Sequence, residues 1–184
     1  YLACAGLIIP VAALISSCLT MKLAGRVVGL CLPGSLLLAL GLLTWKQAHI
    51  YADEMTLWQD TVAKNPASWM AHNNLGIALV EKSQLDEAIG HYREALRLRP
   101  DYAEAYNNLG IALGKKGQVE EAIRQYRESL RLKPDYAKAH YNLGLALDGR
   151  GQLAEAIGYY RESLRLRSDS AEAHNNLGAA LDRM

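Results

Sequence analysis

The first 52 residues of this 184-residue chain contain no aspartate or glutamate, and the residues after them contain no cysteine. The three cysteines, Cys4, Cys18 and Cys31, lie in apolar stretches, where a small buried thiol is an ordinary packing residue. No disulfide framework is therefore expected. Residues 1–46 hold three basic side chains, whereas residues 47–184 hold 17 basic and 19 acidic ones. Such a balanced second part has no strong field, so no nucleic-acid partner is expected.

Motifs of catalytic chemistry are also lacking. There is no glycine-rich phosphate loop, and no serine or cysteine has an identifiable base. The histidines lack cysteine or carboxylate ligands at the spacing of metal sites. Asp53 and Glu54 are adjacent acids beside an apolar segment; a bilayer-facing glycosyltransferase can use such a pair, but interfacial solvation is the simpler explanation. We therefore expect no catalytic residue, no cofactor and no metal ion, and no enzyme activity in this segment.

Two apolar stretches fill the acid-free part, at about residues 2–21 and 27–45. Each approaches the roughly 20 residues that a helix needs to cross a bilayer, and neither shows the polar face of a core helix. The sequence therefore predicts two transmembrane helices within residues 1–46. The alternatives are a buried core hairpin or, for the first stretch, a secretory signal.

The basic residues predict how these spans are oriented. Lys22 and Arg26 lie in the short connection between them, and basic connections favour the cytoplasmic side. The region after the spans is then expected on the opposite side of the membrane, in the periplasm or the lumen of the secretory pathway.

The rest of the chain repeats itself every 34 residues. Leucine followed by glycine recurs at this offset, and so do an alanine, a tyrosine, a small residue and a proline. The recurring residues are Leu75-Gly76, Leu109-Gly110, Leu143-Gly144 and Leu177-Gly178; Ala88, Ala122 and Ala156; Tyr92, Tyr126 and Tyr160; Ala95, Ser129 and Ser163; Pro66, Pro100 and Pro134. A period of this length predicts stacked helix pairs. Because one pair cannot bury both of its apolar faces, stability must come from contacts between neighbours in a curved solenoid.

This pattern resembles the tetratricopeptide repeat (TPR), a helix-turn-helix unit of the same length. The resemblance implies an all-α solenoid, a right-handed superhelix of helical hairpins, here preceded by the two predicted transmembrane helices. Residues 47–68 are expected to hold a juxtamembrane helix, at about 52–64, as a degenerate leading half-repeat. The complete repeats are expected at residues 69–102, 103–136 and 137–170, followed by the first helix of a truncated fourth at 171–184. Further spans are expected before Tyr1, and further repeats are expected after Met184.

Local signals predict where the helices begin and turn. Asp101 and Asp169 precede two of the leading helices and are predicted to cap them. Gly117 and Gly151 fall between paired helices, with Ser83 at the same place in the first repeat. A residue that tolerates a left-handed backbone is expected there.

One asparagine recurs in every repeat, directly before the leucine-glycine pair: Asn74, Asn108, Asn142 and Asn176. It resembles the asparagine ladder in the repeat superhelix of the O-linked N-acetylglucosamine transferases. A carboxamide both donates to and accepts from a peptide backbone, so this row is predicted to bind an extended polypeptide. Asn73, Asn107 and Asn175 are expected to add flanking contacts. The alternative is that the asparagines bond only to neighbouring helices.

Two functional hypotheses follow. The first is a membrane-anchored interaction module that binds a polypeptide or another protein in its concave groove. The second arises because apolar spans followed by such repeats resemble the multi-spanning protein O-mannosyltransferase-like family. That resemblance implies a substrate-presenting region of a membrane glycosyltransferase, inactive by itself, and it leaves the activity of the parent protein open.

Overall fold

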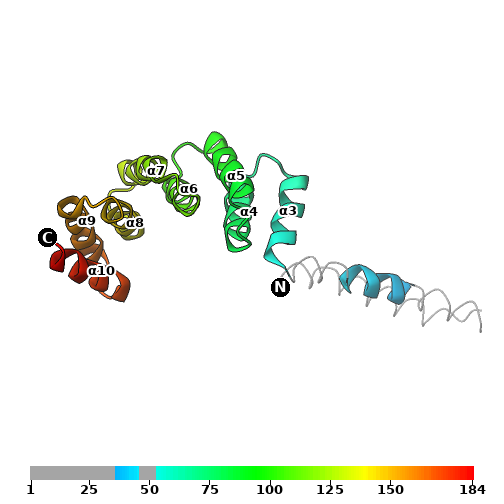
Figure 1. The fold of residues 1–184 in the computed structure, drawn as a ribbon. Helices are drawn as coiled ribbons and strands as arrows, with labels where there is room; N and C mark the ends of the chain where they lie inside the picture. Colours follow the sequence, from blue (N-terminus) through cyan, green and yellow to red (C-terminus); the bar gives the residue numbers. More distant parts are fainter. Residues whose placement is uncertain (1–35, 46–52) are drawn as a thin grey trace, which may run out of the picture. The chain divides into compact units, whose positions relative to one another are not determined.

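The computed structural model describes residues 36–45 and 53–184 (Figure 1). The chain divides into two units, 1–52 and 53–184. In the first unit, residues 36–45 are helical and their leucines are mostly exposed. The predicted span 2–21 and the start of the span 27–45 lie outside the described residues. Within the described ranges, no helix has the length and apolar content needed to cross a membrane. The two transmembrane helices therefore stay a prediction.

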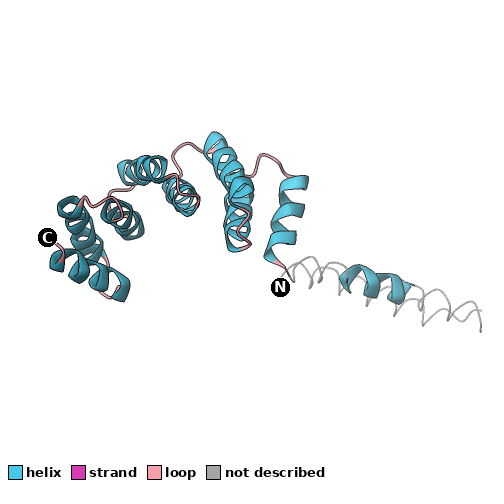
Figure 2. Ribbon diagram, in the orientation of Figure 1, coloured by secondary structure: helices cyan, strands magenta, loops and turns pink. Residues whose placement is uncertain are grey.

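The second unit is built of helices, and no strand occurs in the part of the chain that the structure describes (Figure 2). The predicted unit 69–102 contains α4 and α5, the unit 103–136 contains α6 and α7, and the unit 137–170 contains α8 and α9. The helices are α3 (Glu54–Lys64), α4 (Trp69–Glu81), α5 (Leu85–Leu98), α6 (Ala103–Lys115), α7 (Val119–Leu132), α8 (Ala137–Asp148), α9 (Leu153–Leu166) and α10 (Ala171–Asp182).

Helices α3 to α10 form a row in chain order, and each contacts the next (Figure 1). The first helices of successive repeats, α4, α6, α8 and α10, also contact one another. Equivalent contacts between the second helices, α5, α7 and α9, are weak or missing. Packed elements that approach more closely on one side give a curved stack, so the first helices line its inner face.

The core of each repeat forms where a tyrosine of the second helix lies over the glycine of the first. A Cβ atom added to Gly110 would lie 2.5 Å from Cε1 of Tyr126, so only glycine permits this approach. The same contact occurs at Gly76 with Tyr92 and at Gly144 with Tyr160. Burial raises the pKa of all three phenols. Around them lie the buried leucines Leu75, Leu79, Leu109, Leu113, Leu143 and Leu147.

The turns inside the repeats share one hydrogen-bond pattern. Ser83, Gly117 and Gly151 all have a positive φ, of 61°, 82° and 75°. After Gly117, the amide of Gln118 donates to the carbonyl of Leu113 at 2.9 Å. This is the Schellman arrangement, which satisfies carbonyl groups at the end of a helix. The expectation of a left-handed backbone at these three positions is confirmed.

The predicted caps are wrong. Helix α6 begins at Ala103 with Tyr102 as its N-cap residue and without a side-chain cap. Helix α10 is capped by Ser170, whose Oγ accepts from the Ala173 amide at 3.3 Å. Asp101 and Asp169 lie one residue too early to reach the free amides of the first turn. Each instead pairs with an arginine two residues before it, at 3.2 and 3.5 Å.

Helix α3 packs against α4. Its partly buried side chains Met55, Trp58 and Val62 contact the hydrophobic core. Trp58 lies 34 residues before Tyr92, so the helix contributes an aromatic ring at the position of a second helix. Residues 47–68 thus include one helix that covers the first complete repeat.

Candidate ligand-binding face

The four recurring asparagines lie on the inner face, one on each first helix. We call Asn74, Asn108, Asn142 and Asn176 the asparagine row; all four are half-buried. The residues directly before them, Asn73, Asn107, Tyr141 and Asn175, form the supporting row. In this row Asn73 and Asn107 are buried, with 3% and 2% of their surface exposed.

Hydrogen bonds connect the two rows across each junction between repeats. Nδ2 of Asn108 donates to Oδ1 of Asn73 at 3.1 Å, and Nδ2 of Asn142 donates to Oδ1 of Asn107 at 2.9 Å. At the third junction, Nδ2 of Asn176 donates to the hydroxyl of Tyr141, also at 2.9 Å. The bonds to neighbouring helices that the alternative predicted are therefore present. Tyr141 continues the ladder because a phenol oxygen also accepts a hydrogen bond.

These bonds leave hydrogen-bonding capacity on the asparagine row. A carboxamide has two N–H donors and an oxygen that accepts two bonds, and the ladder uses one donor of Asn108 and of Asn142. Among the described residues, their Oδ1 atoms have no protein partner and are not among the buried unpartnered atoms. Each amide is thus held in one orientation while its oxygen faces solvent.

An apolar row runs beside the asparagines, and sequence reasoning missed it. Ile77 and Leu145 follow Asn74 and Asn142 by three residues, which places them on the same helix face. They are 38% and 48% exposed, and Ile111 at the same position is half-buried. The sequence did contain a signal for this row, because Ile77, Ile111 and Leu145 recur at the 34-residue offset. The face therefore combines amide groups with exposed aliphatic side chains.

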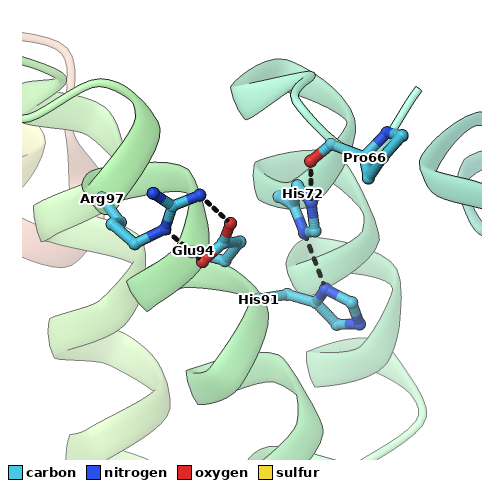
Figure 3. Close-up of polar contacts among 5 residues, drawn as sticks. All are labelled: Pro66, His72, His91, Glu94 and Arg97. Atoms are coloured by element: carbon cyan, nitrogen blue, oxygen red, sulfur yellow. Dashed lines mark hydrogen bonds and ion pairs between the residues drawn. The ribbon is translucent and has the colours of Figure 1, made fainter.

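Recurring histidines attach three of the four first helices, α4, α8 and α10, to the loop before each of them, whereas α6 has Tyr106 at this position. Nε2 of His72, His140 and His174 lies 3.0, 2.8 and 3.0 Å from the carbonyl oxygen six residues earlier. In the first repeat, Nδ1 of His72 also lies 3.0 Å from Nδ1 of His91 (Figure 3). With the proton of His72 assigned to Nε2, His91 donates through Nδ1. Burial, and then the nearby His72, lower the pKa of His91, while Glu87 raises it.

Acidification is expected to weaken the first repeat through His91. Its pKa in the folded state lies below the value of 6.5 for an exposed histidine, so the unfolded chain takes up this proton first. Its contribution to stability is complete above about pH 6.5 and falls as the pH drops toward the lowered folded-state pKa. His91→Gln keeps a donor for His72, as Gln125 stands at this position in the next repeat. Thermal melts at pH 7.5 and 5 should show a smaller drop for the variant; equal drops would contradict this assignment.

His140 differs from His72 in one respect. Its Nδ1 is buried without a hydrogen-bond partner, because Tyr159 stands where the first repeat has His91. The Tyr159 ring lies 5.9 Å from the His140 ring, centre to centre, and provides packing in place of a hydrogen bond. The recurring histidines thus have a structural role, which includes a hydrogen bond to the preceding loop as well as packing.

The basic last turns of the second helices carry ion pairs. Arg97, Arg131 and Arg165 each bind a glutamate three residues earlier, at 2.7 Å in every repeat, and Figure 3 shows the first pair with Glu94. These hydrogen bonds lower the pKa of the glutamates. Since exposed pairs of this kind contribute little to stability, they mainly neutralise the surface. The described ranges also contain no group of three or more potential metal ligands.

Helix pairs that recur every 34 residues, with the first helices along one side, define a helical-repeat solenoid. Two TPR family models match the chain, one at residues 76–117 and the other at residues 107–171 and 149–183. Together they match more than half of it, and the chain belongs to the tetratricopeptide-repeat family. The tetratricopeptide repeat is a non-enzymatic protein-interaction fold. The finer resemblances, to the O-linked N-acetylglucosamine transferases and the O-mannosyltransferase-like proteins, stay predictions.

Solved structures share the fold. MamA from Desulfovibrio magneticus RS-1 is 26% identical, with a TM-score of 0.63 over 70% of this chain and 73% of that chain. The first TPR domain of Spaghetti (RPAP3), bound to the HSP90 peptide SRMEEVD, is 23% identical, with a TM-score of 0.61 over 62% and 91%. The TPR domain of Arabidopsis OM64 is 20% identical, with a TM-score of 0.62 over 64% and 97%. No curated protein matches the chain.

Proposed function

We propose that the repeats bind an extended polypeptide along the inner face, with the asparagine row contacting its backbone. The ladder carries this proposal, because it holds the amides of Asn108 and Asn142 in a fixed orientation while their Oδ1 atoms face solvent. A group that is ordered before binding loses little conformational freedom when the ligand arrives. Asn73 and Asn107 are buried, so we assign them the role of orienting the row.

The spacing of the row suits an extended chain. Packed helices lie about 8–10 Å apart, and an extended chain rises about 3.3 Å per residue. One asparagine would therefore meet roughly every third residue of the ligand. Because the bonds go to the backbone, recognition would tolerate many sequences, and the exposed Ile77 and Leu145 would add a preference for apolar side chains nearby. The Spaghetti domain, of the same fold, is bound to a peptide.

Replacing Asn108 and Asn142 together with alanine should weaken the binding of a peptide at least tenfold, because two backbone contacts are lost. Titration calorimetry with a panel of unstructured, uncharged peptides would measure this loss. The exposed Arg124 and Arg161 on the second helices provide the control: Arg124→Ala with Arg161→Ala should leave the affinity unchanged.

Stability must be followed in the same samples. Without Asn108 the buried Oδ1 of Asn73 loses its donor, which costs about 1–3 kcal/mol, so circular dichroism should confirm that the helix content is kept. Asn107→Ala removes support without removing a member of the row and should weaken binding less than the double variant does. If the well-folded double variant binds every peptide as the wild type does, the ladder is purely structural.

We propose further that residues 1–46 anchor the repeats to a membrane, with the repeats on its extracytoplasmic side. The two apolar stretches without acids and the basic connection between them support this. A reporter that is active only in the cytoplasm, fused after Met184, should be inactive, and activity would reverse the orientation. The glycosyltransferase alternative would need further spans with an acidic first loop upstream of Tyr1.

A further inference from the structure

At each junction between repeats, a basic residue lies directly after the second helix of one repeat. It is brought close to the residue that precedes the first helix of the next repeat. At the first junction, Cζ of Arg99 lies 4.4 Å from the ring centre of Trp69 and 5.5 Å from that of Tyr102. The two rings meet edge to face, with their centres 4.7 Å apart. At the second junction, Nζ of Lys133 lies 5.1 Å from the ring centre of Tyr136. An aromatic ring covers the cation in both places.

The third junction lacks this ring. Arg167 stands in the place of Arg99 and Lys133, but Ser170 stands in the place of Tyr102 and Tyr136. A hollow of about 250 Å³ opens here, and Ala137, Tyr141, Arg167 and Ser170 are among its lining residues. Ala137 is half-buried, whereas its counterpart Ala103 at the second junction is 5% exposed. The serine thus leaves open the space that a tyrosine ring occupies one repeat earlier.

The lining favours an aromatic occupant. A guanidinium attracts the face of an aromatic ring, and Arg167 has only an exposed pair with Asp169, at 3.5 Å. Lys138 and Glu172 also line the hollow. The two cations, Arg167 and Lys138, outnumber the one carboxylate, so the lining carries a net positive charge that disfavours a lysine or arginine side chain. Pockets for drug-sized ligands begin near about 300 Å³, so this hollow has the size for one side chain.

The hollow adjoins the proposed peptide-binding face. Tyr141 lines it, and the hydroxyl of the same residue accepts the hydrogen bond from Asn176. A polypeptide that follows the asparagine row therefore passes beside it. We infer that this pocket binds an aromatic side chain of the polypeptide ligand, in the place that Tyr102 and Tyr136 occupy at the other junctions. This inference rests on the proposed function and adds a preference to it.

Two peptides that differ only in one tyrosine or serine test the pocket. Wild-type protein should bind the tyrosine peptide several-fold to about tenfold more tightly, as one ring contact with a cation allows. Ser170→Tyr fills the pocket from within and should bind both peptides equally. Ser170→Ala removes the same helix cap but leaves the pocket open, so it should keep the preference. A preference that persists in Ser170→Tyr, or is missing in the wild type, would overturn the inference.

A reciprocal variant tests whether the preference for tyrosine can be restored as well as abolished. Tyr136→Ser combined with Ser170→Tyr closes the third junction and opens the second, so a tyrosine preference should return. Circular dichroism on each variant confirms the helix content. If that double variant is folded but shows no preference, the junction geometry does not select for aromatic rings.

A small probe separates this inference from the proposed function. p-Cresol needs no peptide backbone, so it should shift the NMR signal of the Ala137 methyl group in the wild type and not in Ser170→Tyr. If the signal shifts but no peptide binds, the pocket is supported and the proposed polypeptide-binding function is rejected. Peptide binding through the asparagine row without the p-cresol shift would reject the pocket alone.

Discussion

Replacing Leu113 with alanine should lower the free energy of unfolding by about 2–5 kcal/mol, the range for removing a large aliphatic side chain from a core. Leu113 is fully buried at 0% exposure and belongs to the core cluster that runs through successive repeats. It lies in the second complete repeat, so the lost contacts weaken both the hairpin of α6 and α7 and its neighbours. Because solenoid stability is a sum of repeat and interface terms, a weakened centre also separates the flanking repeats.

Urea denaturation followed by circular dichroism would measure this change. Leu145→Ala is the matched control, because Leu145 lies on α8 with 48% of its surface exposed. Alanine is at least as good a helix former as leucine, so the control should change the unfolding free energy by less than about 0.5 kcal/mol. Similar losses at Leu113 and Leu145 would show that burial in this stack does not determine stability.

Gly110→Ala should destabilise the protein, although alanine favours a helix by about 1 kcal/mol over glycine. The added methyl group would meet the Tyr126 ring at 2.5 Å, and Tyr126 is only 5% exposed. The ring has no free space to enter, so α6 and α7 must move apart. Overpacking of this kind costs about 1–3 kcal/mol.

Gly90→Ala on α5 is the opposite case. Nothing lies within 4 Å of an added Cβ atom there, so the substitution should stabilise the protein by roughly 0.5–1 kcal/mol through helix propensity alone. Thermal melts of the two variants should therefore shift in opposite directions. A stabilised Gly110→Ala protein would mean that Tyr126 adapts easily and that the glycine is not needed for close packing.

The fold class was predictable because the signal repeats. Any one leucine-glycine pair or tyrosine is weak evidence, but the same residues at a 34-residue offset in successive units left a single interpretation. The family models and the structure confirm an all-α stack of such repeats. The two predicted transmembrane helices rest on composition alone, since most of their residues lie outside the described part of the chain.

The helix caps show where local reasoning fails. An aspartate before an apolar pattern suggested a cap at Asp101, yet α6 begins at Ala103 after Tyr102. Tyr102 takes the cap position because its ring contacts Trp69 and Arg99 at the junction with the previous repeat. Contacts across the junction therefore outweighed the capping preference of a single side chain.

The sequence by itself determined the repeat, its helix pairs and the row of asparagines on the first helices, because these depend on spacing along the chain. Only the tertiary structure decided what the asparagines bond to, since Asn108 meets Asn73 from 35 residues away. It also revealed the hollow beside Ser170. At the other junctions between repeats, the ring of Tyr102 or Tyr136 stands in the equivalent place. Packing between repeats sets the distances between side chains from different units, and these distances cannot be read from the spacing of residues within one unit.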